Sequence, residues 1–339
     1  QAAEPPESGY GINATFDEAV AAARRPYLHY QRTGLQGRKA ILASVRSSML
    51  ENAERLAEMA HAETGLGRVV DKVMKNRLVT TLAPGPEDLE LEAVTGDQGM
   101  MVTEFAPFGV VGSITPTTNP TSTIINNTIS IVSAGNAVVF NVHPSAKRVS
   151  AENIRLLNRA IQAGGGPADL VTAIPAPTID SAKAVMNHPD VALLLVTGGP
   201  GVVREAMRTD KVVIAAGPGN PPAVVDQTAD VDKAGRDIVA GASLDNNIIC
   251  VDEKTTIAVD TIPDRLVRSM ANNGAYVHNE HELKRLERVI FKELGPARKP
   301  GVVNPAFIGK NAGVILGEIG VQTGDEVRLV VAEVPEGHN

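Results

Sequence analysis

The sequence predicts an α/β protein that contains a doubly wound parallel sheet, and three observations support this prediction. Between residues 109 and 216, short apolar runs alternate with segments of helical character. The apolar runs lack polar alternation, which is typical of strands buried on both faces of a parallel sheet. Loops rich in Gly, Pro, Thr and Ser follow these runs, and parallel sheets bind ligands beyond the carboxyl ends of their strands.

Each element of this region follows from its own pattern. Strands are expected at residues 109–115, 136–142, 170–174, 191–197 and 211–216. Helices are expected between them at residues 120–133, 151–162, 180–187 and 202–208. Pro120 in the first turn and Gly135 after the last turn fit the preferred ends of a helix. The strand–helix–strand order implies right-handed crossovers, so the region is Rossmann-like.

The first hundred residues read mainly as helices. Thr15 and Glu18 have the spacing of a capping box, in which each side chain satisfies a free backbone N–H. Four apolar residues then recur at helical spacing: Ile41, Leu42, Val45 and Met49. Residues 80–105 are less regular and contain a Pro-Gly-Pro turn at 84–86. We expect this segment to form an extended arm or hairpin that serves oligomerisation.

A chain of 339 residues is too long for one core, so two domains are expected. Residues 1–222 would hold the N-terminal helices and a dinucleotide-binding domain, and residues 223–339 a second α/β domain. In that second domain, helices are expected at 232–242, 262–272 and 280–294, and strands at 255–259 and 327–334. The last strand is followed only by PEGHN, so the domain looks incomplete.

Composition excludes several classes of function. The net charge of −7 and the lack of basic runs argue against binding to nucleic acid or to an anionic membrane. No apolar run reaches the roughly 18 residues that a membrane span needs. The start, QAAEPPESGYG, is polar and reads as a linker or as the frayed end of a longer chain rather than as a signal peptide. One cysteine cannot form an intramolecular disulfide, and no metal-binding motif is present, so we expect a cytoplasmic protein without a metal.

The stretch LDNNIICVDEK contains Cys250, the single cysteine of the chain. One interpretation is that its sulfur fills space beside Ile248, Ile249 and Val251, as free cysteines among aliphatic residues usually do. The other is that the sulfur is a nucleophile. This window alone favours the first interpretation.

Two further motifs also have two interpretations. Asn119 precedes a helix that opens with Pro120, so it can be a helix cap or an amide donor to an oxyanion; the spacing alone favours the cap. The glycines of TGGPGVV, residues 197–203, can form a tight strand-to-helix turn or allow the backbone to approach a phosphate. The motif is not a full G-x-G-x-x-G fingerprint.

Taken together, five segments resemble the aldehyde dehydrogenase superfamily. They are ITPTTNPTSTIINNTIS (114–130), SAGNAVVFNVHPSAK (133–147), VTGGPGVV (196–203), AAGPGNPPAVVD (215–226) and the Cys250 loop. The resemblance also covers ETGLGRVVDKVMKN (63–76). More narrowly, the chain is similar to the CoA-acylating branch, which includes propionaldehyde and acetaldehyde dehydrogenases of bacterial microcompartments. This implies an aldehyde dehydrogenase-like fold, with a Rossmann-like cofactor domain and a catalytic domain at residues 223–339.

The resemblance assigns roles to individual residues. Cys250 falls at the catalytic nucleophile, and Asn119 lies in the oxyanion segment. Hydrolytic relatives carry their asparagine one place earlier, at Thr118 here, so which side chain meets the oxyanion stays open. The implied cofactor-binding residues are Thr115, Pro116 and Thr117 near the nicotinamide, His143, Pro144 and Ser145 near the adenosine ribose, Thr197, Gly198, Gly199 and Val202 at the pyrophosphate, and Ala216 and Gly217.

One departure from the hydrolytic relatives bears on mechanism. They carry a water-activating glutamate at the place of Ala215. Without that carboxylate, a thioester on Cys250 can wait for a thiol such as coenzyme A. The resemblance therefore implies that a short-chain aldehyde, NAD+ and coenzyme A are converted to acyl-CoA and NADH.

The resemblance also implies a homo-oligomer and association with a microcompartment shell or lumen. The family's chains run past the point where this one ends, which suggests a truncated form. Two alternatives remain open: a semialdehyde dehydrogenase with another substrate, and a catalytically silent fragment that acts as a binding or scaffold module.

Overall fold

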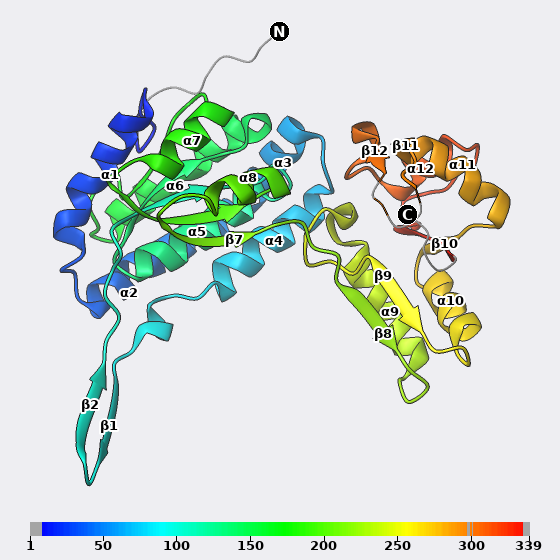
Figure 1. Cartoon of the computed structure of the whole chain (residues 1–339), viewed down its shortest axis with the longest axis horizontal. Helices are drawn as coiled ribbons and strands as arrows, with labels where there is room; N and C mark the ends of the chain where they lie inside the picture. Colours follow the sequence, from blue (N-terminus) through cyan, green and yellow to red (C-terminus); the bar gives the residue numbers. More distant parts are fainter. Residues whose placement is uncertain (1–8, 297–298, 300, 335–339) are drawn as a thin grey trace. The chain divides into compact units, whose positions relative to one another are not determined.

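The computed structural model describes residues 9–296, 299 and 301–334, so the first eight residues of the predicted linker lie outside the described part. The chain divides into two compact units. The first contains the residues up to 64 and residues 72–218, and the second contains residues 65–71 and the residues from 219 onward. Figure 1 shows the elements of both units. The expected domain boundary at residues 222 and 223 stays a prediction.

A five-stranded parallel sheet forms the centre of the first unit. Its strands are β3 (Val110–Ile114), β4 (Ala137–Asn141), β5 (Val171–Ala173), β6 (Val191–Thr197) and β7 (Val212–Ala216). Their order is β5-β4-β3-β6-β7, and every neighbouring pair is parallel. The predicted doubly wound sheet is confirmed. Because β4 follows β3 on one side and β6 lies on the other, the strand order reverses between β3 and β6.

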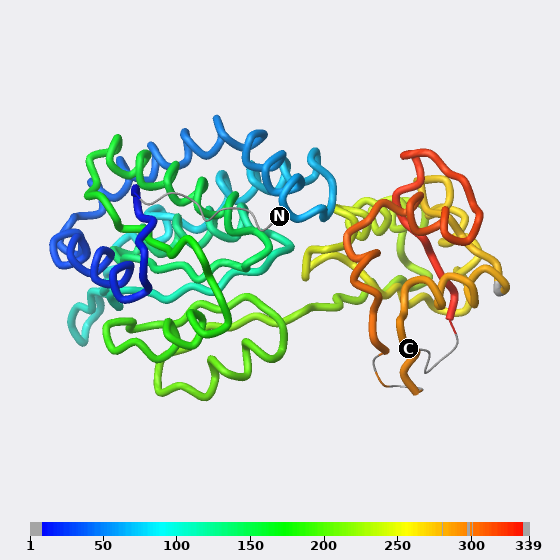
Figure 2. The backbone as a smooth tube through the Cα atoms, turned by 90° about the horizontal axis from the view of Figure 1, so that it is seen from above, coloured from blue at the N-terminus to red at the C-terminus, as the bar shows by residue number. Residues whose placement is uncertain are grey.

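Helices cover both faces of this sheet (Figure 2). The crossover helices are α5 (Pro120–Ser133), α6 (Lys147–Ala163), α7 (Ile179–Asn187) and α8 (Pro200–Ala206). The N-terminal helices are α1 (Phe16–Tyr30), α2 (Leu35–Glu51), α3 (Ala53–Thr64) and α4 (Val69–Leu82). Helices α5 and α6 pack on one face with α2 and α3 behind them, and α1 and α7 pack on the other. One continuous core of aliphatic side chains joins these layers.

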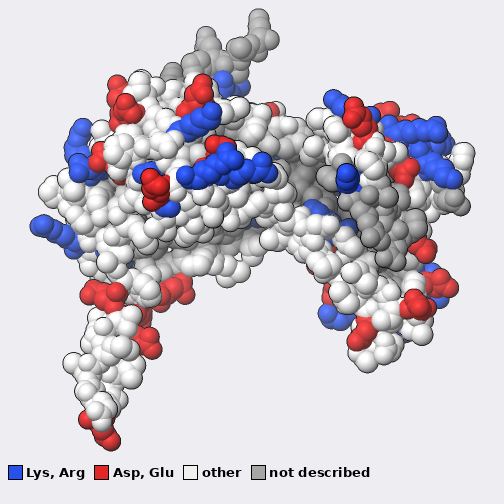
Figure 3. Space-filling model, in the orientation of Figure 1, with Lys and Arg blue, Asp and Glu red and all other residues white. Residues whose placement is uncertain are grey.

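A hairpin of β1 (Glu92–Gly96) and β2 (Gly99–Thr103) extends from the first unit. All ten of its strand residues are exposed. Figure 3 shows acidic side chains near the two ends of the hairpin and largely uncharged sides between them. The expected arm at residues 80–105 is therefore wrong at its start, because helix α4 continues to Leu82 and a 3-10 turn, η1 (Pro86–Leu89), precedes the hairpin.

In its described residues, the second unit contains three pairs of strands and four α-helices. The parallel pairs are β8 (Pro222–Val225) with β9 (Thr255–Ala258), and β10 (Ala275–Val277) with β13 (Leu329–Val331). The antiparallel pair is β11 (Phe291–Glu293) with β12 (Val302–Val303). The helices are α9 (Val231–Ala242), α10 (Pro263–Asn272), α11 (Glu280–Ile290) and, shorter, α12 (Ala312–Gly317), with 3-10 turns η3 (Leu244–Asn247) and η4 (Pro305–Phe307).

Two helix boundaries differ from the sequence-based prediction for tertiary reasons. Helix α6 begins at Lys147 rather than at 151, because the Glu63 carboxylate accepts hydrogen bonds from the Arg148 and Val149 amides at 2.9 and 2.7 Å. Helix α11 ends at Ile290 rather than at 294, because the next residues pair with β12. Among the described helices, none has the length and hydropathy that a bilayer span requires.

Tyr30 anchors α1 to the end of α5. Its side chain is 1% exposed, and its hydroxyl donates a 2.9 Å hydrogen bond to the Val132 carbonyl. Burial raises the pKa of Tyr30 above its ordinary value, so the hydroxyl stays protonated and acts as a donor at neutral pH.

Replacing Tyr30 by Phe should lower the free energy of unfolding by about 1 kcal/mol, because one buried hydrogen bond is lost while the ring still fills its space. Urea unfolding followed by circular dichroism measures this change. Tyr27→Phe in the same helix is the matched control and should have a smaller effect. If both variants lose the same free energy of unfolding, the hydrogen bond of the Tyr30 hydroxyl does not stabilise the fold.

Candidate active site

The predicted cofactor residues meet at one edge of the sheet in the first unit. Residues 115–119 follow β3, residues 143–145 follow β4, residues 197–199 end β6 and begin the next loop, and residues 216–217 end β7. Parallel strands place their carboxyl ends at the same edge, so these loops lie together where the strand order reverses between β3 and β6. Ligands bind at such a switch point in open α/β sheets. That these residues bind a cofactor stays a prediction.

Thr115 is the most unusual of these residues. It is 3% exposed, and its amide donates to the Asn141 carbonyl at 3.3 Å. Its Oγ1 atom is buried, and among the described residues it has no hydrogen-bond partner. A buried polar atom without a partner is costly, so this hydroxyl is suited to meet a polar group of a ligand.

The turn after β4 has a fixed geometry. His143 caps the 3-10 turn η2 (Pro144–Ala146), and its Nδ1 accepts a 3.2 Å hydrogen bond from the Ser145 amide. Desolvation lowers the pKa of His143 below the ordinary histidine value. The ring is therefore neutral at pH 7, which this bond requires, because Nδ1 must keep its lone pair.

The glycine turn after β6 is open where the predicted pyrophosphate would lie. The Gly198 amide donates to the Ala216 carbonyl at 3.2 Å, which ties the turn to β7. Gly199 has φ −67° and ψ 166°, which any residue adopts, and a Cβ added there would touch nothing within 4 Å. Local packing therefore does not demand glycine at position 199. A tight turn therefore does not explain the glycine at position 199, and the space beside it is open to a ligand.

Asn119 occupies the N-cap position of α5 but does not cap it. Its side chain makes no capping hydrogen bond. Instead, its Oδ1 accepts a 2.6 Å hydrogen bond from Lys75 Nζ, and its Nδ2 donates to Thr118 Oγ1 at 3.0 Å. The cap interpretation, which the sequence favoured, is therefore wrong for this side chain.

The Cys250 loop belongs to the second unit. Cys250 is a free thiol of intermediate exposure, and Val251 is 72% exposed. Ile248 and Ile249 are also only partly buried. This neighbourhood is not an aliphatic core, so the space-filling interpretation of Cys250 is not supported. A Cβ at Gly219 would overlap the Cys250 carbonyl oxygen, so a side chain at position 219 does not fit beside this loop.

Three consecutive left-handed residues shape the approach to the cysteine. Asp245, Asn246 and Asn247 have φ of 47°, 57° and 61°. Asn and Asp tolerate this conformation better than other non-glycine residues, but each such residue needs support from its surroundings. Asn247 receives that support within the loop, since its Nδ2 donates to the carbonyls of Ala242 and Glu253 at 2.6 and 3.0 Å.

The other two residues are held from segment 65–71. Asp245 is fully buried, and its Oδ1 accepts from the Arg68 amide at 2.7 Å. The Asp245 amide donates to Asp71 Oδ2 at 2.9 Å, and Arg328 donates to the same oxygen at 2.8 Å. Arg68 Nε donates to Asn246 Oδ1 at 2.9 Å. These bonds fix the start of the cysteine loop.

Sequence reasoning missed several of the residues described above, among them Asp71, Lys75, Asp245 and Arg328. Helix α4 shows why. Its buried side chains include Asp71, Lys72, Lys75, Asn76 and Thr80, whereas its exposed large apolar residues are Val70, Met74, Leu78 and Leu82. Amphipathic periodicity assigns apolar residues to the core, so it would place Asp71 and Lys75 in solvent. No local signal distinguishes this reversed helix.

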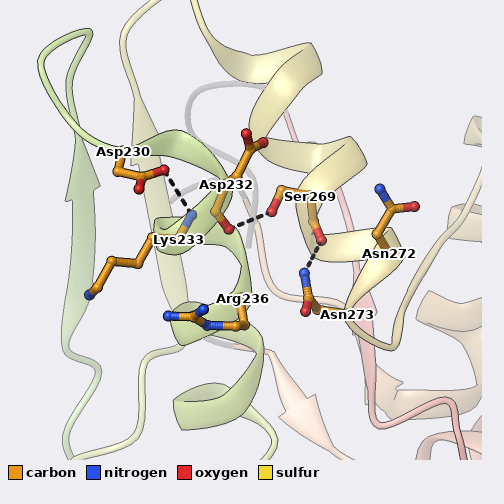
Figure 4. Close-up of a pocket in the computed structure, with 7 residues that line it drawn as sticks. All are labelled: Asp230, Asp232, Lys233, Arg236, Ser269, Asn272 and Asn273. Atoms are coloured by element: carbon orange, nitrogen blue, oxygen red, sulfur yellow. Dashed lines mark hydrogen bonds between the residues drawn. The ribbon is translucent and has the colours of Figure 1, made fainter.

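A concave surface with a volume of about 490 Å³ lies between α9 and α10 (Figure 4). It is lined by Asp230, Asp232, Lys233, Arg236, Ser269, Asn272 and Asn273. Several of its polar groups bond one another; Ser269 Oγ, for example, donates to the Asp232 carbonyl at 2.8 Å. None of the predicted site residues lies there. Within the described ranges, no group of three or more His, Cys, Asp or Glu side chains could hold a metal ion.

Gly67 tests how the cysteine loop is held. It has φ +68°, and a Cβ there would overlap the Asp245 carboxylate. Gly65 has φ +67°, but its nearest neighbour, Lys310 Nζ, would lie at 3.4 Å. Alanine at either site should cost about 1–2 kcal/mol of backbone strain. Only Gly67→Ala should also displace Asp245 and change the rate at which iodoacetamide labels Cys250.

The labelling rate is followed by mass spectrometry, and Gly65→Ala is the control with matched backbone strain. If both variants label Cys250 at the rate of the unchanged protein, the contact between Gly67 and Asp245 does not set the loop.

Comparison with known proteins places these features in a family. The sequence profile of the aldehyde dehydrogenase family matches residues 9–285. The chain is 44% identical over 329 residues to the acetylating acetaldehyde dehydrogenase of Salmonella typhimurium, covering 97% of this chain and 70% of that protein. It is 42% identical over 313 residues to the CoA-propanoylating propanal dehydrogenase of Citrobacter freundii, covering 92% of this chain and 66% of that protein.

Solved structures agree with these relatives. A propionaldehyde dehydrogenase from the fucose utilisation microcompartment of Clostridium phytofermentans has a TM-score of 0.91 at 38% identity, over 97% of this chain and 74% of that one. The Rhodopseudomonas palustris propionaldehyde dehydrogenase, solved with bound CoA and an acylated cysteine, has a TM-score of 0.91 at 40% identity, over 98% of this chain and 75% of that one. The chain therefore belongs to the aldehyde dehydrogenase family, in its CoA-acylating branch.

Proposed function

We propose that this protein oxidises a short-chain aldehyde, propionaldehyde or acetaldehyde, to its CoA thioester through an acyl group carried on Cys250. One observation carries the assignment. The similar R. palustris enzyme holds an acylated cysteine and bound CoA, and Cys250 is the only cysteine in this chain. If the chemistry is shared, the acyl group has no other thiol to occupy.

The edge of the sheet fits a dinucleotide. The unpartnered Thr115 hydroxyl offers a polar contact, and the open turn at Gly199 leaves room for a phosphate. We assign Thr115, Pro116 and Thr117 to the nicotinamide side, and His143, Pro144 and Ser145 to the ribose side. Thr197, Gly198, Gly199 and Val202 would border the pyrophosphate, and Ala216 and Gly217 would complete the site. NAD+, when bound, accepts the hydride from the substrate.

The protein's own groups account for the remaining steps. The Cys250 sulfur attacks the aldehyde carbon, and the carbonyl oxygen becomes an oxyanion. We assign the Asn119 amide as a donor to this oxygen, because Lys75 holds its Oδ1 and Thr118 accepts from its Nδ2, which leaves the second Nδ2 hydrogen for a ligand. Loss of the hydride and collapse of the oxyanion leave a thioester on Cys250. The thiolate of coenzyme A then attacks the acyl carbon and releases the Cys250 thiolate, so one thioester replaces another.

Two observations support the proposed preference for a thiol over water. Ala215 on β7 carries no carboxylate, although hydrolytic relatives have a water-activating glutamate there. The Cys250 loop holds two buried carboxylates, Asp245 and Asp252. Asp245 Oδ1 accepts from the Arg68 amide at 2.7 Å, and Asp252 Oδ2 accepts from the Ile249 amide at 3.3 Å. These bonds give both carboxylates a role in holding the loop. We therefore expect hydrolysis of the thioester to be slow.

Turnover should depend on coenzyme A. Propanal and NAD+ alone should release at most about one NADH per Cys250, because the acyl group stays on the enzyme; adding CoA should start sustained turnover. Absorbance at the NADH band and mass spectrometry of the intact protein follow the two steps. Cys250→Ser should lower turnover by roughly 10⁴-fold or more. Sustained NADH release without CoA would contradict the acyl-transfer step.

The same assay separates the alternatives. A clear preference for succinic semialdehyde over propanal would indicate a semialdehyde dehydrogenase. A protein that neither binds NAD+ nor reacts with iodoacetamide at Cys250 would be a scaffold module rather than an enzyme.

We also propose that the protein works as a homo-oligomer in which the β1–β2 hairpin packs on a second copy. In the hairpin, Val94 pairs with Met101, and Ala93 pairs with Val102. Val94, Met100, Met101 and Val102 are each at least half exposed. An isolated two-stranded hairpin is marginally stable in water, so an apolar one gains from being covered.

A charge placed on the hairpin should weaken this assembly. Met101→Lys is expected to shift the protein toward smaller species, because the ammonium would have to be desolvated in the interface. Light scattering coupled to size exclusion measures the change. Gln98→Lys, in the polar turn of the same hairpin, is the control and should leave the assembly intact. A wild-type protein that is already monomeric would overturn the proposal.

We place the protein in the bacterial cytoplasm, in the lumen of a microcompartment. The similar C. phytofermentans enzyme comes from such a compartment, and a volatile aldehyde substrate gives a chemical reason for enclosure. Association with the shell stays part of this proposal.

A further inference from the structure

We propose that Lys75 is a positioning residue, which orients and polarises the Asn119 amide so that its Nδ2 group can donate to the oxyanion. This inference rests on the proposed function, in which Asn119 stabilises the oxyanion formed when Cys250 attacks the aldehyde. It adds a residue from an N-terminal helix to the machinery of the oxyanion segment.

The first step is that Asn119 bonds Lys75 instead of capping helix α5. It stands at the N-cap of α5, where asparagine is among the strongest capping residues, yet it makes no capping bond. Its oxygen is held by Lys75 Nζ at 2.6 Å instead. The first turn of α5 therefore lacks a side-chain cap, and Asn119 instead bonds a residue 44 positions earlier in the chain.

The second step concerns the direction of the amide. An ammonium group has only donors, so the oxygen of Asn119, and not its nitrogen, must face Lys75. The nitrogen therefore faces the other way, where one of its hydrogens meets Thr118 Oγ1 at 3.0 Å. The second hydrogen remains for a ligand oxygen. Lys75 thus decides which end of the amide is presented.

The third step is electronic. A charge-assisted hydrogen bond to an amide oxygen draws electron density from the amide and makes its N–H groups better donors, as hydrogen bonds in a chain polarise one another. Lys75 is 7% exposed, so solvent screens this effect less than at the surface. A donor prepared in this way before the reaction suits an oxyanion whose charge develops only during the attack.

The fourth step is that Lys75 itself is well placed. The next residue, Asn76, is fully buried and bridges two elements: its Nδ2 donates to the Ala53 carbonyl at 3.0 Å, and its Oδ1 accepts from Thr121 Oγ1 at 2.8 Å. Asn153 Nδ2 donates to the Thr121 carbonyl at 3.0 Å. Helix α4 is thereby fixed to the first turn of α5, which keeps the Lys75 ammonium opposite Asn119.

Lys75→Met tests the inference, because methionine has a similar length and no donor. We expect a kcat reduced by about 10- to 100-fold, somewhat less than the roughly 10²–10³-fold loss for removing one oxyanion donor, with an unchanged Kd for NAD+. In an Asn119→Ala background, Lys75→Met should cost little more. If Lys75→Met reduces kcat by the same factor in the wild-type and the Asn119→Ala backgrounds, Lys75 does not act through Asn119 and the proposal is overturned.

Thr80→Val is the matched control for packing. It removes the buried 2.6 Å hydrogen bond that the Thr80 hydroxyl donates to the Asn76 carbonyl within α4, without touching Asn119 or the bonds between α4 and α5. It should lower thermal stability while leaving kcat within about twofold. If Thr80→Val and Lys75→Met reduce kcat equally, Lys75 contributes only to packing and the inference fails.

A crystal structure of Lys75→Met separates this inference from the proposed function. Released from the ammonium, the Asn119 side chain should rotate so that its oxygen caps the first turn of α5. An Asn119 side chain that keeps its place in this variant would disprove the positioning role, whatever the activity. If the rotation occurs but the wild-type protein shows no CoA-dependent aldehyde oxidation, the proposed function fails and the positional role of Lys75 stands.

Discussion

The Asp245 carboxylate accepts a hydrogen bond from the Arg68 amide, 177 positions earlier in the chain. The conformation of the cysteine loop depends on this buried acceptor, because Asp245 is also the first of three residues with positive φ. Its own amide is held by Asp71, which in turn is held by Arg328. The proposed nucleophile needs a defined direction of attack. A loop held by hydrogen bonds at each residue with positive φ would provide one.

Buried polar side chains recur in helix α4 and in the Cys250 loop, the two segments next to the proposed catalytic residues in our assignment. Helix α4 buries charged and amide groups and exposes its aliphatic ones. Buried polar groups are expensive unless their partners are in place, so a helix that carries them adds little to stability through the hydrophobic effect. The hydrogen bonds of Asn76 and Lys75 instead specify one arrangement of α4 against the start of α5. These bonds hold Asn119, which we propose as a donor to the oxyanion, in one orientation.

The proposed acyl transfer to coenzyme A needs fewer catalytic groups than hydrolysis. Hydrolysis of a thioester requires a base that activates water, whereas transfer to another thiol needs only access, because a thiolate is already a strong nucleophile. Ala215 is consistent with this difference, since a methyl side chain occupies the place where hydrolytic relatives carry a carboxylate. With a single cysteine in the chain, the acyl group has one possible carrier.

The amino-acid sequence determined the layers of the first unit, because apolar runs and helix ends at Pro120, Gly135 and Thr15 are local signals. It also placed the predicted cofactor residues at one sheet edge, since strands joined by helical crossovers run parallel and end at the same edge. Tertiary structure alone decided the early start of α6, which is capped by Glu63, the reversed faces of α4, and the orientation of Asn119. In each case the partner lies dozens of residues away, and a hydrogen bond between distant segments leaves no periodicity in the sequence of either one.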